Sequence, residues 1–170
     1  MGTMHTSVPR WPAAAPGVDP AGRALTLLGF GVEGRRLVHR WSAEVAAGTP
    51  VDVQLADRAD EVALATLADR VAGAVVGWRL MLAGPEVDVL AARAVAIAGG
   101  ALDAELRLAV TGTQEKRVYC PHCGTTTTTT APIAGETACQ GCGRRLHVYA
   151  HVSRRTGSYL GFLADAEEVA

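Results

Sequence analysis

The chain has 170 residues, of which 49% are hydrophobic, and its 16 basic residues nearly balance its 17 acidic ones. This length allows one ordinary domain or two small ones. A net charge near zero argues against nucleic acid or an acidic membrane surface as a partner. Arg, Asp or Glu interrupts every apolar stretch before it reaches the length of a membrane helix. We therefore expect a cytoplasmic protein that binds neither nucleic acid nor membrane.

The first 22 residues contain four prolines among small residues, and no basic start is followed by an apolar run. This pattern excludes a secretory signal peptide. Because proline can neither continue a helix nor donate a hydrogen bond to a sheet, we expect residues 1–22 to form a disordered Pro/Ala-rich arm.

Strand-like and helix-like segments then alternate along the chain. Short apolar or alternating runs predict strands at 24–30, 51–55, 78–83 and 104–110. Apolar residues at three-and-four spacing predict helices at 32–47, 57–72 and 86–98. Because short helical crossovers join neighbouring parallel strands, residues 23–112 are expected to form an α/β domain with a small, mostly parallel sheet and flanking helices.

A glycine-rich turn follows the first predicted strand. Gly29, Gly31 and Gly34 fit the pattern GxGxxG, whose backbone amides can cradle a phosphate at a helix N-terminus. Asp52 and Asp57 flank the next strand, and one of them, with Asp57 preferred, is the candidate for binding a ribose hydroxyl. Glu33, however, places a negative charge where a diphosphate would lie. A structural strand-to-helix turn is therefore the preferred interpretation, and nucleotide binding is the alternative.

Two CxxCG segments lie in the second half of the chain, separated by fifteen residues. Their cysteines are Cys120, Cys123, Cys139 and Cys142. Two residues between cysteines allow a tight turn that aims both sulfurs at one ion, and the following glycine accepts the unusual backbone angles. Fifteen residues suffice for a hairpin that returns the second pair to the first. We predict one four-thiolate metal site in a small β ribbon at residues 113–150.

The identity of the ion is open at this point, because four thiolates in a tetrahedron suit Zn²⁺ and also hold a single iron in rubredoxin-like sites. Zinc is the preferred ion. His122, His147 and His151 lie nearby in the sequence and offer substitute ligands, although we interpret them as exposed ribbon histidines. Because so small a ribbon has little apolar area, metal binding would supply much of its stability.

Residues 78–86 read WRLMLAGPE and are followed by a helix, two glycines and a further strand. This order resembles the last strand-helix-strand unit of ferredoxin-reductase-like nicotinamide domains, in which a strand ends in a Cys-Gly-Pro turn. Ala83 stands here in place of that cysteine, and no flavin-binding barrel precedes the unit. The resemblance implies a truncated reductase-like domain that does not transfer hydride alone.

The segments VYCPHCG at 118–124 and CQGCGRRLHVYAHVSRRTGSYLGFLADAEE at 139–168, together with the reductase-like unit, resemble the small subunit of bacterial dimethylamine monooxygenase. The resemblance implies a multi-subunit, NADPH-dependent haem enzyme that converts dimethylamine to methylamine and formaldehyde. It also implies that haem, FMN and a [2Fe-2S] cluster reside on larger partner subunits. The four cysteines of this chain would be used by the ribbon, which leaves none for such a cluster.

The last segment, residues 151–170, combines paired arginines with aromatic residues and glycines. This composition is typical of a docking surface. We expect a C-terminal docking tail in which partner contacts are made by Arg154, Arg155, Tyr159 and Phe162. An ordinary solvated tail is the alternative.

The sequence as a whole predicts an accessory metal-binding subunit of an oxidoreductase of methylated amine metabolism, not catalytic alone. No nucleophile with an adjacent base, no acid–base pair and no haem-ligand pattern can be assembled from the spacing. Two alternatives remain. The ribbon is a rubredoxin-like electron carrier of the same kind of complex, or it is a zinc-ribbon adaptor that binds nucleic acid or protein through its arginines.

Overall fold

A computed structural model of the chain describes residues 7–164, which divide into two compact units. The first comprises residues 11–113, and the second comprises residues 7–10 together with residues 114–164. The chain therefore passes between the units twice, after residue 10 and after residue 113. None of the helices between residues 7 and 164 is long and apolar enough to cross a bilayer.

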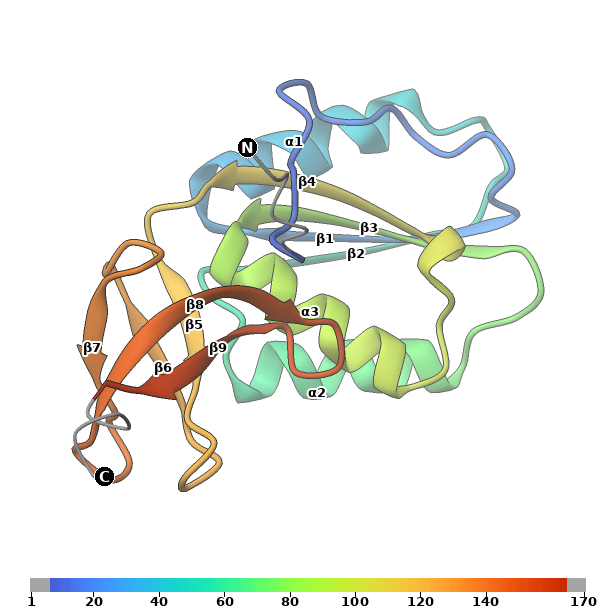
Figure 1. Cartoon of the computed structure of the whole chain (residues 1–170). Helices are drawn as coiled ribbons and strands as arrows, with labels where there is room; N and C mark the ends of the chain where they lie inside the picture. The colour runs from blue at the N-terminus through green and yellow to red at the C-terminus, as the bar shows by residue number, and fades with distance from the viewer. Residues whose placement is uncertain (1–6, 165–170) are drawn as a thin grey trace. The chain divides into compact units, whose positions relative to one another are not determined.

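The first unit is a four-stranded, wholly parallel sheet in the order β2-β1-β3-β4, with helices between consecutive strands (Figure 1). Its elements are β1 Ala24–Phe30, α1 Gly31–Glu44, β2 Val51–Ala56, α2 Glu61–Ala72, β3 Trp78–Pro85, α3 Glu86–Ala98, the 3₁₀ turn η1 Asp103–Glu105 and β4 Leu106–Gly112. The predicted α/β domain with a parallel sheet is confirmed. Its likeness to ferredoxin reductases stays a prediction.

The strand order reverses after β2, so the helices cover both faces of the sheet. Figure 1 shows α1 on one face and α2 with α3 on the other, as right-handed crossovers require. The larger core packs α2 and α3 on the sheet and includes Leu28, Leu67, Leu80, Leu82 and Val89. The smaller core packs α1 on the opposite face and includes Leu25, Leu27, Val38, Trp41 and Met81.

Residues 11–22 of the segment expected to be a disordered arm lie against this unit and make specific contacts. The indole N–H of Trp11 donates to Glu86 at 2.7 Å, and that of Trp41 donates to the carbonyl of Pro16 at 2.8 Å. The carboxylate of Asp19 is buried and lies 3.3 Å from both Arg79 and Arg107. The structure therefore differs from the expectation over residues 11–22, and residues 1–6 lie outside the described part.

The second unit is a five-stranded sheet in the order β6-β5-β9-β8-β7. Its strands are β5 Lys116–Tyr119, β6 Thr126–Thr129, β7 Glu136–Ala138, β8 Arg145–Ser153 and β9 Ser158–Leu163. The pair β5–β9 is parallel and the remaining pairs are antiparallel, so this sheet is mixed. Residues 7–10 join it through Ser7, whose hydroxyl accepts a 3.2 Å hydrogen bond from the backbone N–H of Val152.

Strand β9 lies in the middle of this sheet, between β5 and β8. Its first residues are fully or almost fully buried, with Ser158 at 0% and Tyr159 at 2% exposure. The structure thus differs from the expected boundary between a ribbon at 113–150 and a tail at 151–170, because residues 151–163 complete the ribbon sheet. The rest of the predicted tail, residues 165–170, lies outside the described range.

Candidate metal centre

The two CxxCG segments form knuckles with the same backbone hydrogen bonds. The N–H of Gly124 donates to the carbonyl of Cys120 at 2.9 Å, and the N–H of Gly143 donates to that of Cys139 at 2.9 Å. Both glycines have positive φ, +78° and +72°, which L side chains rarely adopt. The glycine after each cysteine pair is therefore required by the turn that aims the sulfurs.

The knuckles bring all four sulfurs into one cluster, in which every pair of sulfurs lies within 4.8 Å. The Sγ atoms of Cys120 and Cys142 are 3.8 Å apart, and those of Cys123 and Cys139 are 3.5 Å apart. A tetrahedral ion with metal–sulfur bonds of about 2.3 Å requires sulfurs separated by about 3.8 Å. The four cysteines are free thiols and fit a single tetrahedral ion such as zinc or iron.

Backbone amides favour negative charge in this cluster. The N–H groups of Cys142 and Gly141 point at Cys139 and lower the pKa of its thiol to about 6. Hydrogen bonds from Thr125 lower the pKa of Cys123. At Cys142 the backbone of Arg144 also favours the thiolate, but burial and the three neighbouring sulfurs outweigh it and raise the pKa to about 11. Four close thiols cannot all ionise without a cation, and a divalent ion supplies that charge.

Three residues other than the cysteines and the glycines that follow them support the knuckles. The hydroxyl of Thr127, 2% exposed on β6, accepts a 3.0 Å hydrogen bond from the backbone N–H of Gln140. A Cβ added to Gly141 would lie 2.3 Å from the Thr125 hydroxyl and 3.1 Å from the sulfur of Cys123. Thr127 therefore ties the second knuckle to β6, and Gly141 leaves room for Thr125 and the Cys123 sulfur to approach this knuckle.

The sequence analysis did not predict these contacts, because consecutive threonines are typical of a β-strand but do not show which of them face the knuckles. The position of the first threonines, directly after the first knuckle, was the available signal that they could contact the metal centre. Among the described residues, the cysteine cluster is the group of His, Cys, Asp and Glu side chains placed to hold a metal ion, and none of the three ribbon histidines belongs to it.

The glycine-rich turn forms the junction of β1 and α1, as the preferred interpretation predicts. A Cβ on Gly29 would lie 2.7 Å from the carbonyl oxygen of Gly34, and one on Gly34 would lie 2.5 Å from that of Ala83. These glycines let α1 pack on the sheet. Asp57 is ion-paired with Arg35. Each of these residues thus has a structural role, and nucleotide binding stays a prediction.

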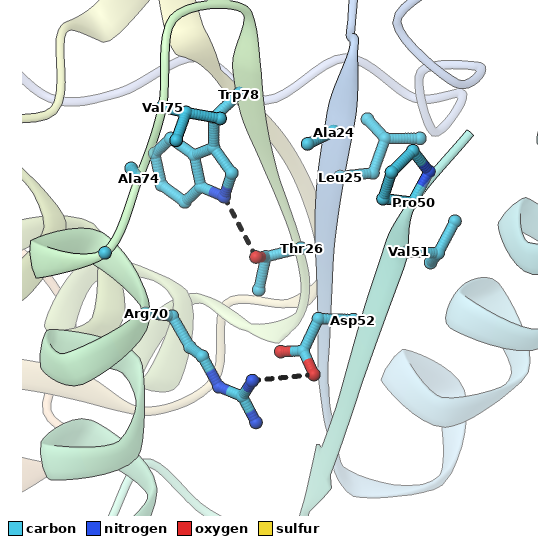
Figure 2. A pocket seen from close by; sticks show the side chains of 11 residues that line it. Ala24, Leu25, Thr26, Pro50, Val51, Asp52, Arg70, Ala74, Val75 and Trp78 are labelled. Atoms are coloured by element: carbon cyan, nitrogen blue, oxygen red, sulfur yellow. Dashed lines mark hydrogen bonds and ion pairs between the residues drawn. The ribbon is translucent and has the colours of Figure 1, made fainter.

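Two cavities lie in the α/β unit, and Glu33 of the glycine-rich turn lines the second of them. One, of about 250 Å³, opens at the start of β1 and β2 and is lined by Thr26, Val51, Asp52, Arg70 and Trp78 among others (Figure 2). In it the Trp78 indole donates to the Thr26 hydroxyl at 3.0 Å, and Arg70 pairs with Asp52 at 3.0 Å. The other, of about 490 Å³, lies between residues 12–15, α1 and the end of β4. Neither cavity is lined by Gly29, Gly31, Gly34 or Asp57.

The predicted docking residues separate in the structure. Tyr159 is buried in the ribbon sheet, so its ring is unavailable to a partner, and this part of the prediction was wrong. Phe162 is 52% exposed on β9 and lies opposite His147 of β8. Arg154 and Arg155 are exposed in the turn between these strands. Tyr149, 57% exposed on β8, was not predicted and adds a second aromatic ring.

A parallel α/β unit followed by a ribbon sheet, in which four clustered thiols could hold a metal ion, defines a two-unit protein with a candidate cysteine metal centre. Residues 117–162, from β5 through β9, match the family model described as "Dimethylamine monooxygenase subunit DmmA-like, C-terminal domain". The predicted resemblance to the small subunit of dimethylamine monooxygenase is confirmed, and residues 117–162 of this chain are similar to the DmmA-like C-terminal domain.

The chain is also similar to the heme-dependent oxidative N-demethylase delta subunit of Ectopseudomonas mendocina (strain ymp). The two are 40% identical over 93 residues, which make up 55% of this chain and 52% of the relative. The chain thus matches about half the length of this curated relative. No solved structure matches the chain.

Proposed function

We propose that the chain is an accessory, metal-binding subunit of a multi-subunit oxidative N-demethylase that uses haem. The observation that carries this proposal is the four-thiol centre, which lies inside the segment matched by the DmmA-like family model. The relative named as a delta subunit supports a place in an assembly with other subunits. Dimethylamine as the substrate and NADPH as the reductant are parts of the same proposal.

The proposal places the oxygen chemistry on other subunits. Within residues 7–164, the cysteines are the one cluster of potential metal ligands, and four thiols already fill a tetrahedral ion. A catalytic metal needs an open coordination position. At this site the ion would gain one only if a cysteine sulfur left it. Haem, FMN, a [2Fe-2S] cluster and NADPH are accordingly assigned to larger partner subunits.

Zinc is the proposed ion, with Cys120, Cys123, Cys139 and Cys142 as its ligands. Bound zinc would hold the two knuckles together and would have no redox chemistry of its own. A single iron is the second candidate, because four thiolates in a tetrahedron also hold iron. With iron bound, the ribbon would be an electron carrier. The exposed side chain of Cys123 favours that candidate, because an exposed ligand gives a partner a short path to the ion.

The proposed docking surface is the exposed face of the β8–β9 hairpin. It is formed by His147, Tyr149, Arg154, Arg155 and Phe162. Within the β8–β9 hairpin, residues 145–163, the sequence has three Arg and no Asp or Glu, although Asp165, Glu167 and Glu168 follow it in the sequence. A basic surface with two exposed rings suits an acidic partner surface that has an apolar pocket.

Co-expression with the haem and flavin subunits of an oxidative N-demethylase tests the proposal. The full chain, carrying an affinity tag, should retain both subunits, recognised by haem absorbance and flavin fluorescence. Dimethylamine-dependent formaldehyde production by the assembly should fall when the chain is omitted. Retention of neither subunit by the metal-loaded chain would contradict the proposal.

A double charge reversal tests the docking surface within the same assay. Arg154→Glu with Arg155→Glu should weaken retention of the large subunits at least tenfold. Arg36→Glu with Arg40→Glu, at exposed positions of α1, serves as the matched control. Both variants should keep one ion per chain. If the wild-type chain instead bound DNA or RNA with an affinity that falls steeply as salt concentration rises, the zinc-ribbon adaptor would be favoured.

A further inference from the structure

Strand β2 is an edge strand with one row of backbone groups directed away from the sheet. The N–H of Leu25 in β1 donates to the carbonyl of Pro50 at 2.9 Å. Because backbone groups alternate sides along a strand, the N–H and C=O groups of Asp52 and Gln54 also face β1. Those of Val51, Val53 and Leu55 face the free edge, where the described residues supply no pairing strand.

The same three residues expose their side chains on one face of the sheet. Val51 is 39% exposed, Val53 is 45% exposed and Leu55 is 39% exposed. Natural edge strands are usually protected by charged side chains, proline or a bulge. Residues 51–56 contain no proline or bulge, and their one charged residue, Asp52, is paired with Arg70 on the opposite face from the three apolar side chains. Exposed apolar side chains next to a row of unpaired backbone N–H and C=O groups therefore indicate that β2 is a surface for pairing with another strand.

We propose that β2 pairs antiparallel with β2 of a second copy of this chain, with Val53 at the twofold axis. In this register Val51 lies opposite Leu55 of the second copy, and Val53 lies opposite itself. Asp52 lies opposite the neutral amide of Gln54. Each outward N–H and C=O group of the three apolar residues gains a partner, and apolar side chains meet apolar side chains across the seam.

The neighbouring registers are less favourable. A twofold axis at Asp52 would place two aspartates directly opposite each other at the closest type of pair, where like charges are destabilising. An axis at Gln54 would place Val51 opposite Asp57, which is already paired with Arg35. The sequence of β2 is thus self-complementary about one residue, which favours a second copy over an unrelated strand.

The dimer joins two four-stranded sheets into one continuous sheet. The contact is small, since each copy contributes one six-residue strand, and interfaces of this size are commonly weak. We therefore expect micromolar self-association. The inference does not depend on the metal centre or on the function proposed above.

Sedimentation equilibrium of the metal-loaded full chain over a range of micromolar concentrations tests the proposal. The mass should rise from 17.6 kDa toward twice that value. Val53→Lys and Val53→Glu should each weaken association at least tenfold, because each places like charges at the axis. An equimolar mixture of the two variants should restore the dimer, since Lys then faces Glu. Val62→Lys, at a position 75% exposed on α2, is the matched control and should associate as the wild type does.

Amide exchange measured by NMR on the wild-type chain gives a readout that needs no variant. The N–H groups of Val51, Val53 and Leu55 should become protected as concentration rises, whereas that of Gln54, directed at β1, should be protected throughout. A wild-type chain that stays at 17.6 kDa with unprotected outward amides overturns the proposal. Failure of the mixed variants to associate overturns the Val53-centred register.

Discussion

The hydroxyl of Thr127, on β6, accepts a 3.0 Å hydrogen bond from the backbone N–H of Gln140, between the two cysteines of the second knuckle. One threonine from the middle of a run of six thus supports the turn that positions Cys139 and Cys142. Because Thr127 is 2% exposed, water cannot readily replace its hydroxyl. The second knuckle therefore depends on a side chain outside the cysteine motif.

Replacing Thr127 by valine should weaken the metal centre. The substitution keeps the β-branched shape and removes the acceptor for the Gln140 N–H, which costs about 1–3 kcal/mol for a buried donor left unsatisfied. Thr128→Val, at an exposed position on the same strand, is the matched control and should change stability by less than about 0.5 kcal/mol. Competition with a chromophoric chelator measures the affinity of each variant, and equal affinities would contradict the role given to Thr127.

Gly141→Ala should disturb the same knuckle by steric overlap. Its Cβ would lie 2.3 Å from the Thr125 hydroxyl and 3.1 Å from the Cys123 sulfur, so one of them must move. We expect metal affinity to fall by about 10–100-fold, as for other supporting residues of metal sites. His122→Ala, at the equivalent position of the first knuckle, should keep wild-type affinity. Indistinguishable chelator competition curves for the two variants would count against this packing.

Asp19 is expected to make the α/β unit sensitive to acid. A hydrogen bond from the N–H of Ala21 lowers its pKa, and Arg107 and Arg79 lower it further against the effect of burial. Because the folded-state pKa lies below the unfolded value, the stabilisation is complete above about pH 4 and is lost as pH falls through the folded pKa.

Asp19→Asn should therefore lower the free energy of unfolding at neutral pH by about 1–3 kcal/mol and flatten the decline of stability at acidic pH. Urea unfolding followed by tryptophan fluorescence at several pH values measures both effects. Asp69→Asn, at an exposed position on α2, is the control. Parallel pH profiles for wild type and Asp19→Asn would show that the Asp19 contacts contribute little.

Removal of the ion should unfold the ribbon and spare the α/β unit. The chain has three tryptophans and three tyrosines, and the tryptophans all lie in residues 11–113 while the tyrosines all lie in the ribbon unit. Displacing the ion with an organomercurial should leave the tryptophan emission maximum unchanged and abolish the tyrosine signals of the folded state in NMR spectra. Retention of the tyrosine signals after release of the ion would show that the ribbon folds without metal.

The features predicted correctly from the sequence are those fixed by local pattern. The CxxCG spacing determines the knuckles, and the alternation of apolar runs with helical spacing determines the parallel sheet. The features that were missed depend on residues distant in the sequence. Tyr159 read as a surface residue because nothing local shows that β9 inserts beside β5, where Val118 pairs with Tyr159. The contact of Trp11 with Glu86 spans 75 residues.

Elemental analysis of the purified chain tests the central claim most directly. The account predicts one transition-metal ion per chain, zinc or a single iron, bound by thiolates. Replacing any one of the four cysteines by serine should reduce this stoichiometry, whereas His122→Ala should leave it unchanged. A chain purified without oxygen that holds no tightly bound metal, with thiols that react freely, would contradict the account.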